Sequence, residues 1–414
     1  MRQKNSIYAI LIVLIIFAPL QRASAAGFFN GYAGIRADMQ FADKATGTFG
    51  PTLALHSFFA GQFNITTNLI ARAEFTLGAG NIFSTKLFTE GADAKFQIDE
   101  ISLIFRRQFL GGANYLSAFV GTYEPVGSDM FLRRQFGIQP IASKITESWL
   151  GLAGSILYPL FGMGISDVVH FSRQPISTGI YVYFNRNNNI NCMAFNSDLR
   201  FACAYQYFYL DVVAGINVPF KTTDATGAKV LLLVNSLYGH AGMTLLAGNN
   251  YTPVAFFLQA GIYDFVLMDT TASKFSISPD KSIYFLAEFR SHFGASQLVF
   301  SAFSLPEDTV KKLLFIHDTL GVNVSFSNNA IHAGAMQFEL GVHTTLSFPN
   351  KYFINVKDIG NFFTSLPTIL LAPYMTMRMS SGEARIMLQL DTTAIVNKKF
   401  AKAFEINVGY KTQF

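Results

Sequence analysis

The sequence predicts an all-β protein, a transmembrane antiparallel up-and-down β-barrel of about 16 strands, with roughly 14 to 18 strands allowed. Half of the 414 residues are hydrophobic and only 14% are charged, whereas soluble globular domains have about 25% charged residues. After residue 25, the apolar side chains occur in short alternating runs and not in the spans of about 20 that a membrane helix requires. This composition excludes a disordered chain, which would combine low hydrophobicity with high charge.

The first 25 residues have the pattern of a secretory signal peptide. Arg2 and Lys4 precede an apolar stretch at 7–20, and the small residues 23–25 place a cleavage site after Ala25. A membrane anchor is the alternative, but the stretch is short for a bilayer about 30 Å thick. We therefore expect a signal peptide at 1–25 and one barrel domain at 26–414. The signal contains three of the 31 basic residues, which leaves 28 against 26 acidic residues. A balance this close argues against nucleic acid as a partner.

Alternating apolar and polar residues predict strands along the rest of the chain. Apolar residues occupy one parity and polar residues the other at 29–41 and 404–414, so the first strand could pair with the last. The same alternation occurs at 69–77, 282–290, 336–348 and 383–391. Such runs match the ~9 to 11 tilted residues of a membrane-spanning strand, whereas most soluble strands have ~5 to 6. In lipid these strands must close into a barrel, because an open edge would find no hydrogen-bond partner.

Turn-forming residues mark the strand ends, for example at 111–112, 248–250 and 328–329. Asn196 and its neighbours are also turn formers, and Cys192 and Cys203 lie symmetrically about Ser197 and Asp198. A hairpin there would bring the two cysteines opposite each other, and an exported chain matures where thiols tend to oxidise. The sequence therefore predicts a Cys192–Cys203 disulfide.

The signal peptide, the long alternating strands and the final strand 408–414 resemble outer-membrane β-barrel proteins of diderm bacteria, of the porin-like kind. The resemblance implies an outer-membrane location in contact with outer-membrane lipid. It also implies that the barrel-assembly machinery reads residues 402–414, with Tyr410 and Phe414 as the aromatic signal. No internal motif identifies a subfamily.

Residues 125–148 do not fit a plain strand and are predicted to form a long loop. In porin-like barrels such a loop commonly folds into the lumen, so Arg133, Arg134 and Lys144 are candidate constriction residues; an ordinary outer loop is the alternative. Residues 304–307 match a capping box with Pro306 at a helix start, which predicts a short helix there.

Charged residues on the inward parity are the candidates for the wall of a pore. Several form pairs of opposite sign two positions apart, and such pairs lie on one face of a strand. The candidates are Arg36, Asp38, Arg72, Glu74, Asp211, Glu288, Arg290, Glu339, His343, Arg385 and Asp391, with Glu383, Glu405 and Lys411 on the same parity. They either line a water-filled channel or only compensate one another's charges across neighbouring strands. The ion preference of the channel stays open.

The seven histidines and two cysteines show no H-E-x-x-H or C-x-x-C spacing, so the sequence predicts no metal and no cofactor. His343 shares an inward face with Glu339, but no nucleophile accompanies it, and an enzyme is not predicted. The chain is expected to be a channel for passive diffusion of small-molecule solutes. The alternative is a transporter of hydrophobic substrates, similar to the fatty-acid-transporter barrels, because mean hydropathy is +0.30 and aromatic residues such as Tyr207 and Tyr209 take the inward parity. A barrel enzyme or an adhesin ranks below both, and the oligomeric state stays open.

Overall fold

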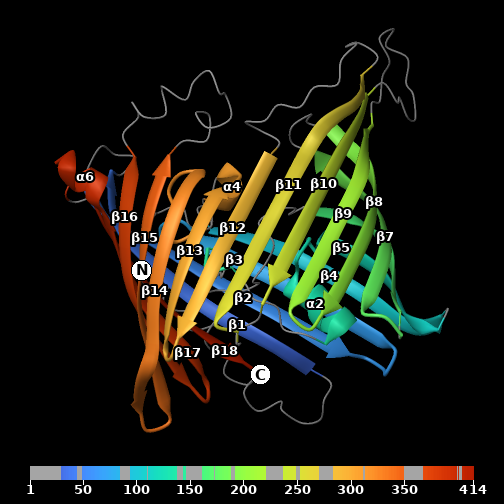
Figure 1. The fold of residues 1–414 in the computed structure, drawn as a ribbon. Coiled ribbons are helices and arrows are strands. Elements are labelled where there is room, and N and C mark those ends of the chain that lie inside the picture. Colours follow the sequence, from blue (N-terminus) through green and yellow to red (C-terminus); the bar gives the residue numbers. More distant parts are fainter. Residues whose placement is uncertain are drawn as a thin grey trace, which may run out of the picture.

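The alternating runs of the sequence fold into long antiparallel strands (Figure 1). The computed structural model describes residues 29–43, 49–83, 94–109, 111–137, 143–145, 161–171, 173–187, 192–220, 236–248, 252–269, 283–310, 313–348, 367–398, 400 and 403–414. The predicted signal peptide, residues 1–25, and residues 138–142 and 146–148 of the predicted loop lie outside this part of the chain. No helix within the described ranges is long and apolar enough to cross a membrane.

The described residues form 18 strands, within the predicted range and even in number. They are β1 (Phe29–Asp43), β2 (Phe49–Asn64), β3 (Leu69–Ala79), β4 (Ala94–Phe109), β5 (Gly112–Thr122), β6 (Phe161–Phe171), β7 (Ile176–Asn187), β8 (Cys192–Tyr205), β9 (Phe208–Pro219), β10 (Ser236–Ala247), β11 (Val254–Asp269), β12 (Ile283–Phe293), β13 (Ser296–Ser304), β14 (Leu320–Ala333), β15 (Met336–Phe348), β16 (Thr368–Met379), β17 (Gly382–Asp391) and β18 (Phe404–Gln413). Three short helices are α2 (Asp129–Phe136), α4 (Glu307–Val310) and α6 (Thr392–Val396).

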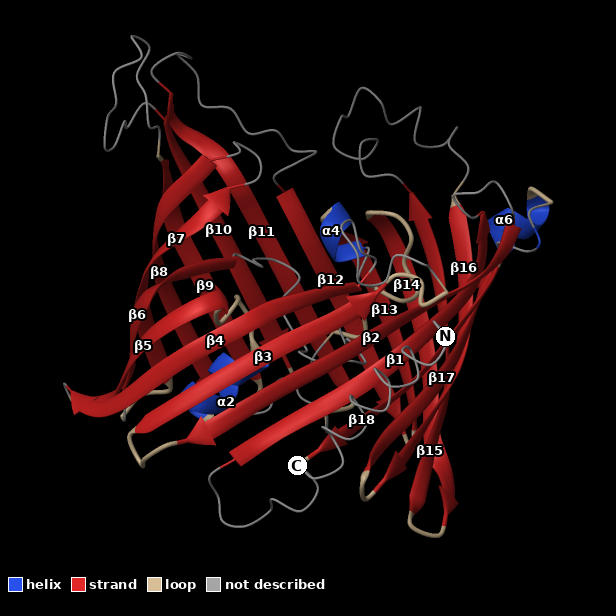
Figure 2. Ribbon diagram, turned by 180° about the vertical axis from the view of Figure 1, so that it is seen from behind, coloured by secondary structure: helices blue, strands red, loops and turns tan. Residues whose placement is uncertain are grey.

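Each strand pairs with the next one along the chain, and β18 pairs with β1, which closes the sheet. At this seam Ile35 lies opposite Tyr410, and Gly31 exchanges two backbone hydrogen bonds of 2.9 and 3.0 Å with Phe414. The predicted pairing of the first strand with the last is confirmed. The result is a closed antiparallel up-and-down barrel (Figures 1 and 2).

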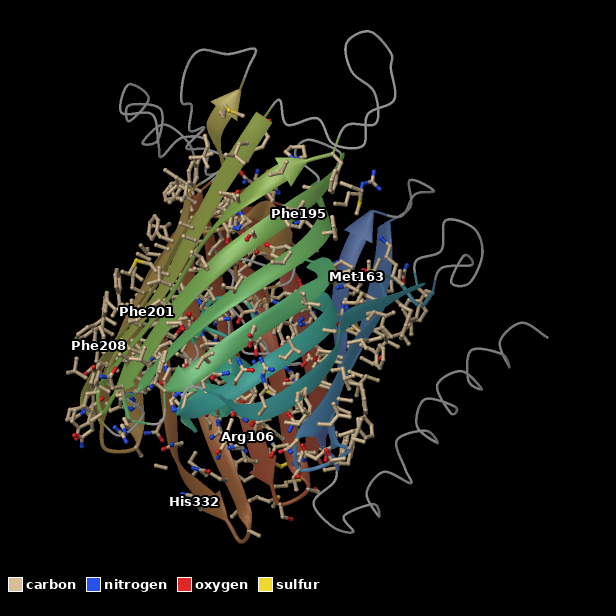
Figure 3. All side chains as sticks on the ribbon, turned by 90° about the vertical axis from the view of Figure 1, so that its right-hand side faces the viewer. Arg106, Met163, Phe195, Phe201, Phe208 and His332 are labelled. Carbon is tan, nitrogen blue, oxygen red and sulfur yellow. The ribbon has the colours of Figure 1, made fainter. Side chains whose placement is uncertain are left out.

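The two faces of the sheet differ in polarity as the period of two predicts. Leu340 and Leu388 are 43% and 40% exposed on the outer face, whereas their neighbours Glu339 and Gln389 are only 7% and 2% exposed. Figure 3 shows side chains standing off the outer face around β6 to β9, where Met163 is labelled. The outside of the barrel is therefore an exposed apolar band, and polar residues such as Glu339 and Gln389 lie on the inner face.

Connections at one end of the barrel are short, and most of those at the other end are long, the asymmetry known from outer-membrane barrels. Gly294 and Gly334 supply the left-handed backbone for two of the turns, with φ of 64° and 61°. The turn predicted at 328–329 is wrong, since both residues lie within β14 at a β-bulge and the chain reverses only at Gly334. Asparagine suits bulges and turns alike, because its short side chain replaces missing backbone partners.

The predicted disulfide is also wrong. Cys192 and Cys203 lie at opposite ends of the single strand β8, which pairs with β7 without interruption from Asn187 to Ile176. Eleven residues of strand separate the two Cα atoms by about 36 Å, at ~3.3 Å per residue, and a disulfide requires roughly 4.4–6.8 Å. Cys203 is a free, buried thiol. No turn forms at Asn196, because its side chain is buried in the sheet and donates to Asn185.

Both predicted irregular segments hold short helices. Within 125–148, helix α2 begins after Ser128, whose hydroxyl caps the backbone N–H of Phe131, and ends at Gly137 in the left-handed conformation. The short helix predicted after Pro306 is confirmed as α4.

Candidate functional site

The loop that follows β5 enters the barrel. The backbone N–H of Gly127 donates to Asp211 on β9 at 2.7 Å. Farther along, the Ser143 hydroxyl donates to Glu288 on β12 at 2.7 Å, and the backbone N–H of Lys144 donates to the same carboxylate at 3.0 Å. Asp211 and Glu288 are both fully covered on the inward face. Residues 123–137 and 143–145, the first infolded segment, therefore lie against the inner wall.

Arg200 on β8 fixes the start of this segment. Its guanidinium donates to the two carboxylate oxygens of Asp211 at 2.8 and 2.5 Å, and its third nitrogen donates to the Glu124 carbonyl at 2.7 Å. The same group lies 3.5 Å from the centre of the Phe131 ring of α2. Both members of the ion pair are at most 1% exposed. The pair therefore attaches the segment to the wall and presents no charge to the lumen.

The three candidate constriction residues differ in their surroundings. Arg134 forms an ion pair with Glu124 and donates to Tyr123 at 3.3 Å, so its charge is compensated inside the segment. Arg133 is exposed. Lys144 lines a polar pocket with residues of β15, β16 and β17. Only Lys144 is thus placed where the segment faces charged residues of another part of the barrel.

A second segment, which the sequence reasoning missed, also enters the barrel after β13. The Phe315 ring stacks on His343 of β15 with centroids 3.8 Å apart, and the Phe315 carbonyl accepts from Thr345 at 2.8 Å. Asp318 accepts from Ser347 at 3.1 Å. Residues 305–310 and 313–319, the second infolded segment, therefore cover the inner face of β15. Its signal in the sequence is the apolar run 313–316, which follows the short helix predicted at Pro306.

The two infolded segments account for apolar residues on the inward parity. Phe131, Leu132, Ile145, Phe315 and Ile316 of the segments belong to one buried cluster with wall residues. Those wall residues include Tyr115, Phe119, Val168, Tyr209 and Met387. Most of these inward apolar side chains are thus covered by chain segments, and Phe119 also lines a small pocket with Tyr123 and Val126. Tyr207, also expected to face inward, instead lies in the turn between β8 and β9 and is exposed.

Charged side chains are partly exposed on the part of the inner wall that the infolded segments do not cover. The side chains of Arg378 on β16, Lys411 on β18 and His56 on β2 are 40%, 35% and 34% exposed, against 1% for Arg200 under the first segment. Because the strands are neighbours in the closed sheet, these residues occupy one continuous part of the inner wall.

Ion pairs connect the residues of this wall across strands. Arg378 contacts Glu339 at 2.6 Å and Glu383 at 3.3 Å, and Glu383 contacts Lys411 at 3.3 Å. The register supports these contacts, since Glu383 lies opposite both Arg378 and Lys411. On β1, Arg36 and Asp38 pair at 2.8 Å, and His56 lies 3.4 Å from Asp38. We call Arg36, Asp38, His56, Arg378, Glu383 and Lys411 the charged arc.

Several of the other predicted wall residues are covered inside the barrel, whereas Arg385 and Glu405 are half-buried and Asp391 lies at the rim. Arg72 contacts Glu74 at 2.5 Å and Glu100 at 3.2 Å, and all three are buried. Glu288 and Arg290 form a buried pair at 2.5 Å. Asp391 lies at the end of β17, where its carboxylate accepts from the Ala394 backbone and caps α6. Its role is therefore that of a helix cap at the rim.

His343 hydrogen-bonds to Ser325 on β14 at 2.5 Å and, through its other ring nitrogen, to Arg385 at 3.3 Å. Ser325 in turn donates to Asn323 at 2.6 Å.

Three wall residues were not predicted from the sequence, namely Arg200, Glu100 and Arg378. The inward parity of β8 was the available signal for Arg200, since residues 194 to 202 alternate burial along it. In the described ranges, no group of three or more His, Cys, Asp or Glu side chains is arranged to hold a metal ion.

No protein-family model matches this sequence, and no curated protein sequence matches it. Among solved structures, the chain is similar to a BenF-like porin from Pseudomonas fluorescens Pf-5, with a TM-score of 0.50, 8% identity and coverage of 94% of this chain and 98% of that one. OccAB3 from Acinetobacter baumannii gives a TM-score of 0.48 with 9% identity, and a mutant porin of Rhodopseudomonas blastica gives 0.41 with 9% identity; each match covers 93% of this chain and 99% of the other. At such identities the likeness concerns the fold alone. The chain has the closed antiparallel barrel fold of the porin-like proteins.

Proposed function

We propose that the protein is an outer-membrane channel through which small solutes diffuse passively. The observation that carries this proposal is the charged arc, an inner wall whose ionic side chains stay up to 40% exposed in a barrel whose outer face is apolar. Charged side chains of both signs on a wet wall suit a permeation path for hydrated solutes. The apolar outer face suits contact with lipid.

The first infolded segment is the constriction in this proposal. Its contacts with Asp211 and Glu288 hold it across the inner faces of β9 to β12, so the path for solutes runs on the side of the charged arc. Lys144 faces that path and joins its wall in a shared pocket. The segment thus narrows the lumen and adds a positive charge at the narrow part.

The location follows from the same proposal. Residues 1–25 serve as a cleaved signal peptide, and residues 402–414 are recognised by the barrel-assembly machinery. Support for the second point comes from the seam, where the Phe414 ring stacks on Phe29 with centroids 5.2 Å apart beside the backbone hydrogen bonds to Gly31. The final aromatic residue is thus joined to the first strand.

A transporter of hydrophobic substrates is not favoured. Such a function requires an extended accessible apolar surface inside the barrel, and the inward apolar residues Tyr209 and Met387 are covered in one cluster with the infolded segments.

Site-directed labelling in a planar bilayer tests the channel. In a background with Cys192→Ala and Cys203→Ala, Lys411→Cys should give channels whose conductance falls when a bulky thiol reagent is added, because position 411 faces the charged arc. Leu388→Cys is the matched control, as its side chain is comparably exposed but faces outward. Absence of ion conductance in the parent protein, or an equal fall for both variants, would contradict the proposal.

A further inference from the structure

Arg385 on β17 differs from the other arginines of the inner wall. Its guanidinium carbon lies 4.2 Å from the centre of the Tyr374 ring, and one nitrogen lies 3.3 Å from the His343 ring nitrogen Nε2. Its Nε atom is buried and has no hydrogen-bond partner among the described residues. The guanidinium is thus held by a ring face and by an imidazole, neither of which carries a negative charge.

The protonation of His343 follows from these contacts. Arginine has only donors, so the Nε2 atom of His343 must accept from Arg385 and its proton must be on Nδ1. Nδ1 then donates to Ser325 at 2.5 Å, and Ser325 donates to Asn323 at 2.6 Å. This chain of neutral groups fixes the orientation of the guanidinium and leaves its charge uncompensated.

Other inner arginines are paired with carboxylates. Such contacts occur for Arg36, Arg72, Arg200, Arg290 and Arg378, at 2.5 to 2.8 Å. Within the described part of the chain, Arg385 makes no such contact. A guanidinium costs free energy to desolvate when no anion accompanies it, so this site is suited to take an anion from outside the protein.

We propose that Arg385 is the centre of a binding site for a small oxyanion, a carboxylate or a phosphate group, on the permeation path. This proposal rests on the channel function and names the class of solute that the channel holds. Arg385 lines a pocket with Lys144 and Thr376, so a further cation and a hydroxyl donor lie beside the ligand position. A planar guanidinium can bind two oxygens of one anion in parallel, and in Arg385 only one nitrogen has a hydrogen-bond partner, His343, among the described residues.

The acids of the same pocket do not oppose this assignment. Glu339 accepts from Arg378 at 2.6 Å and from Tyr374 at 2.9 Å. Glu383 is bound between Arg378 and Lys411, at 3.3 Å from each. Both carboxylates are already compensated, which leaves Arg385 as the charge that an anion can neutralise.

Conductance block by added anions tests this site. Single channels of the purified full chain are recorded in 0.15 M KCl, while acetate in one series and inorganic phosphate in the other is added at constant ionic strength. We expect at least one of the two anions to reduce the current of the parent protein with a saturable dependence. In Arg385→Gln the half-blocking concentration should rise about tenfold or more, because a tenfold change corresponds to only ~1.4 kcal/mol.

Two variants make the result specific. Arg107→Gln removes an arginine that is paired with Asp167 on the outer face, away from the charged arc, and it should keep the parental half-blocking concentration. Arg385→Lys keeps the charge but not the two-pronged geometry, and should lie between the parent and Arg385→Gln. This variant decides the matter if Arg385→Gln does not fold.

The two series also identify the source of the oxyanion, since block by acetate alone indicates a carboxylate and block by phosphate alone indicates a phosphate group. If neither anion blocks the parent channel, or if Arg385→Gln and Arg385→Lys both retain its half-blocking concentrations, the site is refuted. Both of these outcomes leave the conductance of the parent protein, and with it the channel proposal, intact.

Discussion

The buried pair of Arg200 and Asp211 allows a quantitative prediction. In Asp211→Asn the charge of Arg200 remains buried, with one carboxylate oxygen replaced by an amide group that can only donate. Both side chains are at most 1% exposed, and the lost contact is two-pronged at 2.8 and 2.5 Å. Removal of one partner from a buried ion pair costs about 3 to 5 kcal/mol. We expect a loss of this size in the free energy of unfolding.

The control is an aspartate on the outer face. Asp167 lies 3.9 Å from Arg107, and the two side chains are 45% and 46% exposed. An exposed pair contributes at most about 1 kcal/mol, so Asp167→Asn should be nearly neutral. Both variants are compared by reversible urea unfolding in lipid vesicles, followed by far-ultraviolet circular dichroism.

A double variant separates charge from packing. Arg200→Met combined with Asp211→Leu leaves no buried charge without a partner, so it should be at least as stable as Asp211→Asn. If Asp211→Asn loses less than about 1 kcal/mol, or no more than Asp167→Asn, the pair does not anchor the first infolded segment as inferred.

Three further predictions concern the wall, the constriction and the cysteines. Arg in place of Leu340 on the outer face should cost ~2 to 4 kcal/mol of stability in membranes, and the same change at Gln337 should be mild; equal losses in vesicle unfolding would reverse the assigned faces. Lys144→Gln should shift the reversal potential in a salt gradient toward cation preference, because fixed charge at a constriction acts on ions within a Debye length, and an unchanged potential would remove Lys144 from the path. Non-reducing peptide mapping should find no bond between Cys192 and Cys203, and a linked peptide would contradict the continuous strand β8.

The alternating sequence pattern was sufficient to predict the barrel and the direction of many side chains. Arg36, Glu288 and Glu339 face inward as predicted, because the period of two is a local property of an extended chain. The disulfide prediction was wrong for a related reason. An asparagine that lines a polar wall, such as Asn196, has the same appearance in the sequence as one that forms a turn.

What the sequence could not provide was the placement of the infolded segments. Ser143 and Glu288 are 145 positions apart, and no local pattern records that they meet. The second infolded segment depends in the same way on Phe315 reaching His343. The site at Arg385 was only half predictable. The alternation of the sequence placed Arg385 on the inner wall. Its lack of a carboxylate partner depends on the side chains of neighbouring strands, which no local pattern of the sequence records.

The seam between β1 and β18 has a consequence for the order of folding. Asn407 donates to Asp38 across 369 positions of the chain. By loop-closure entropy, joining ends this far apart costs about 3 kcal/mol more than joining ends ~12 residues apart. The hairpins between consecutive strands should therefore form first, and the ring should close last. Until then β1 and β18 present bare hydrogen-bonding edges, which are prone to pair with other chains. The unclosed sheet is thus the stage at which this protein most needs protection from aggregation, and a variant that weakens the Asp38–Asn407 contact should lengthen that stage.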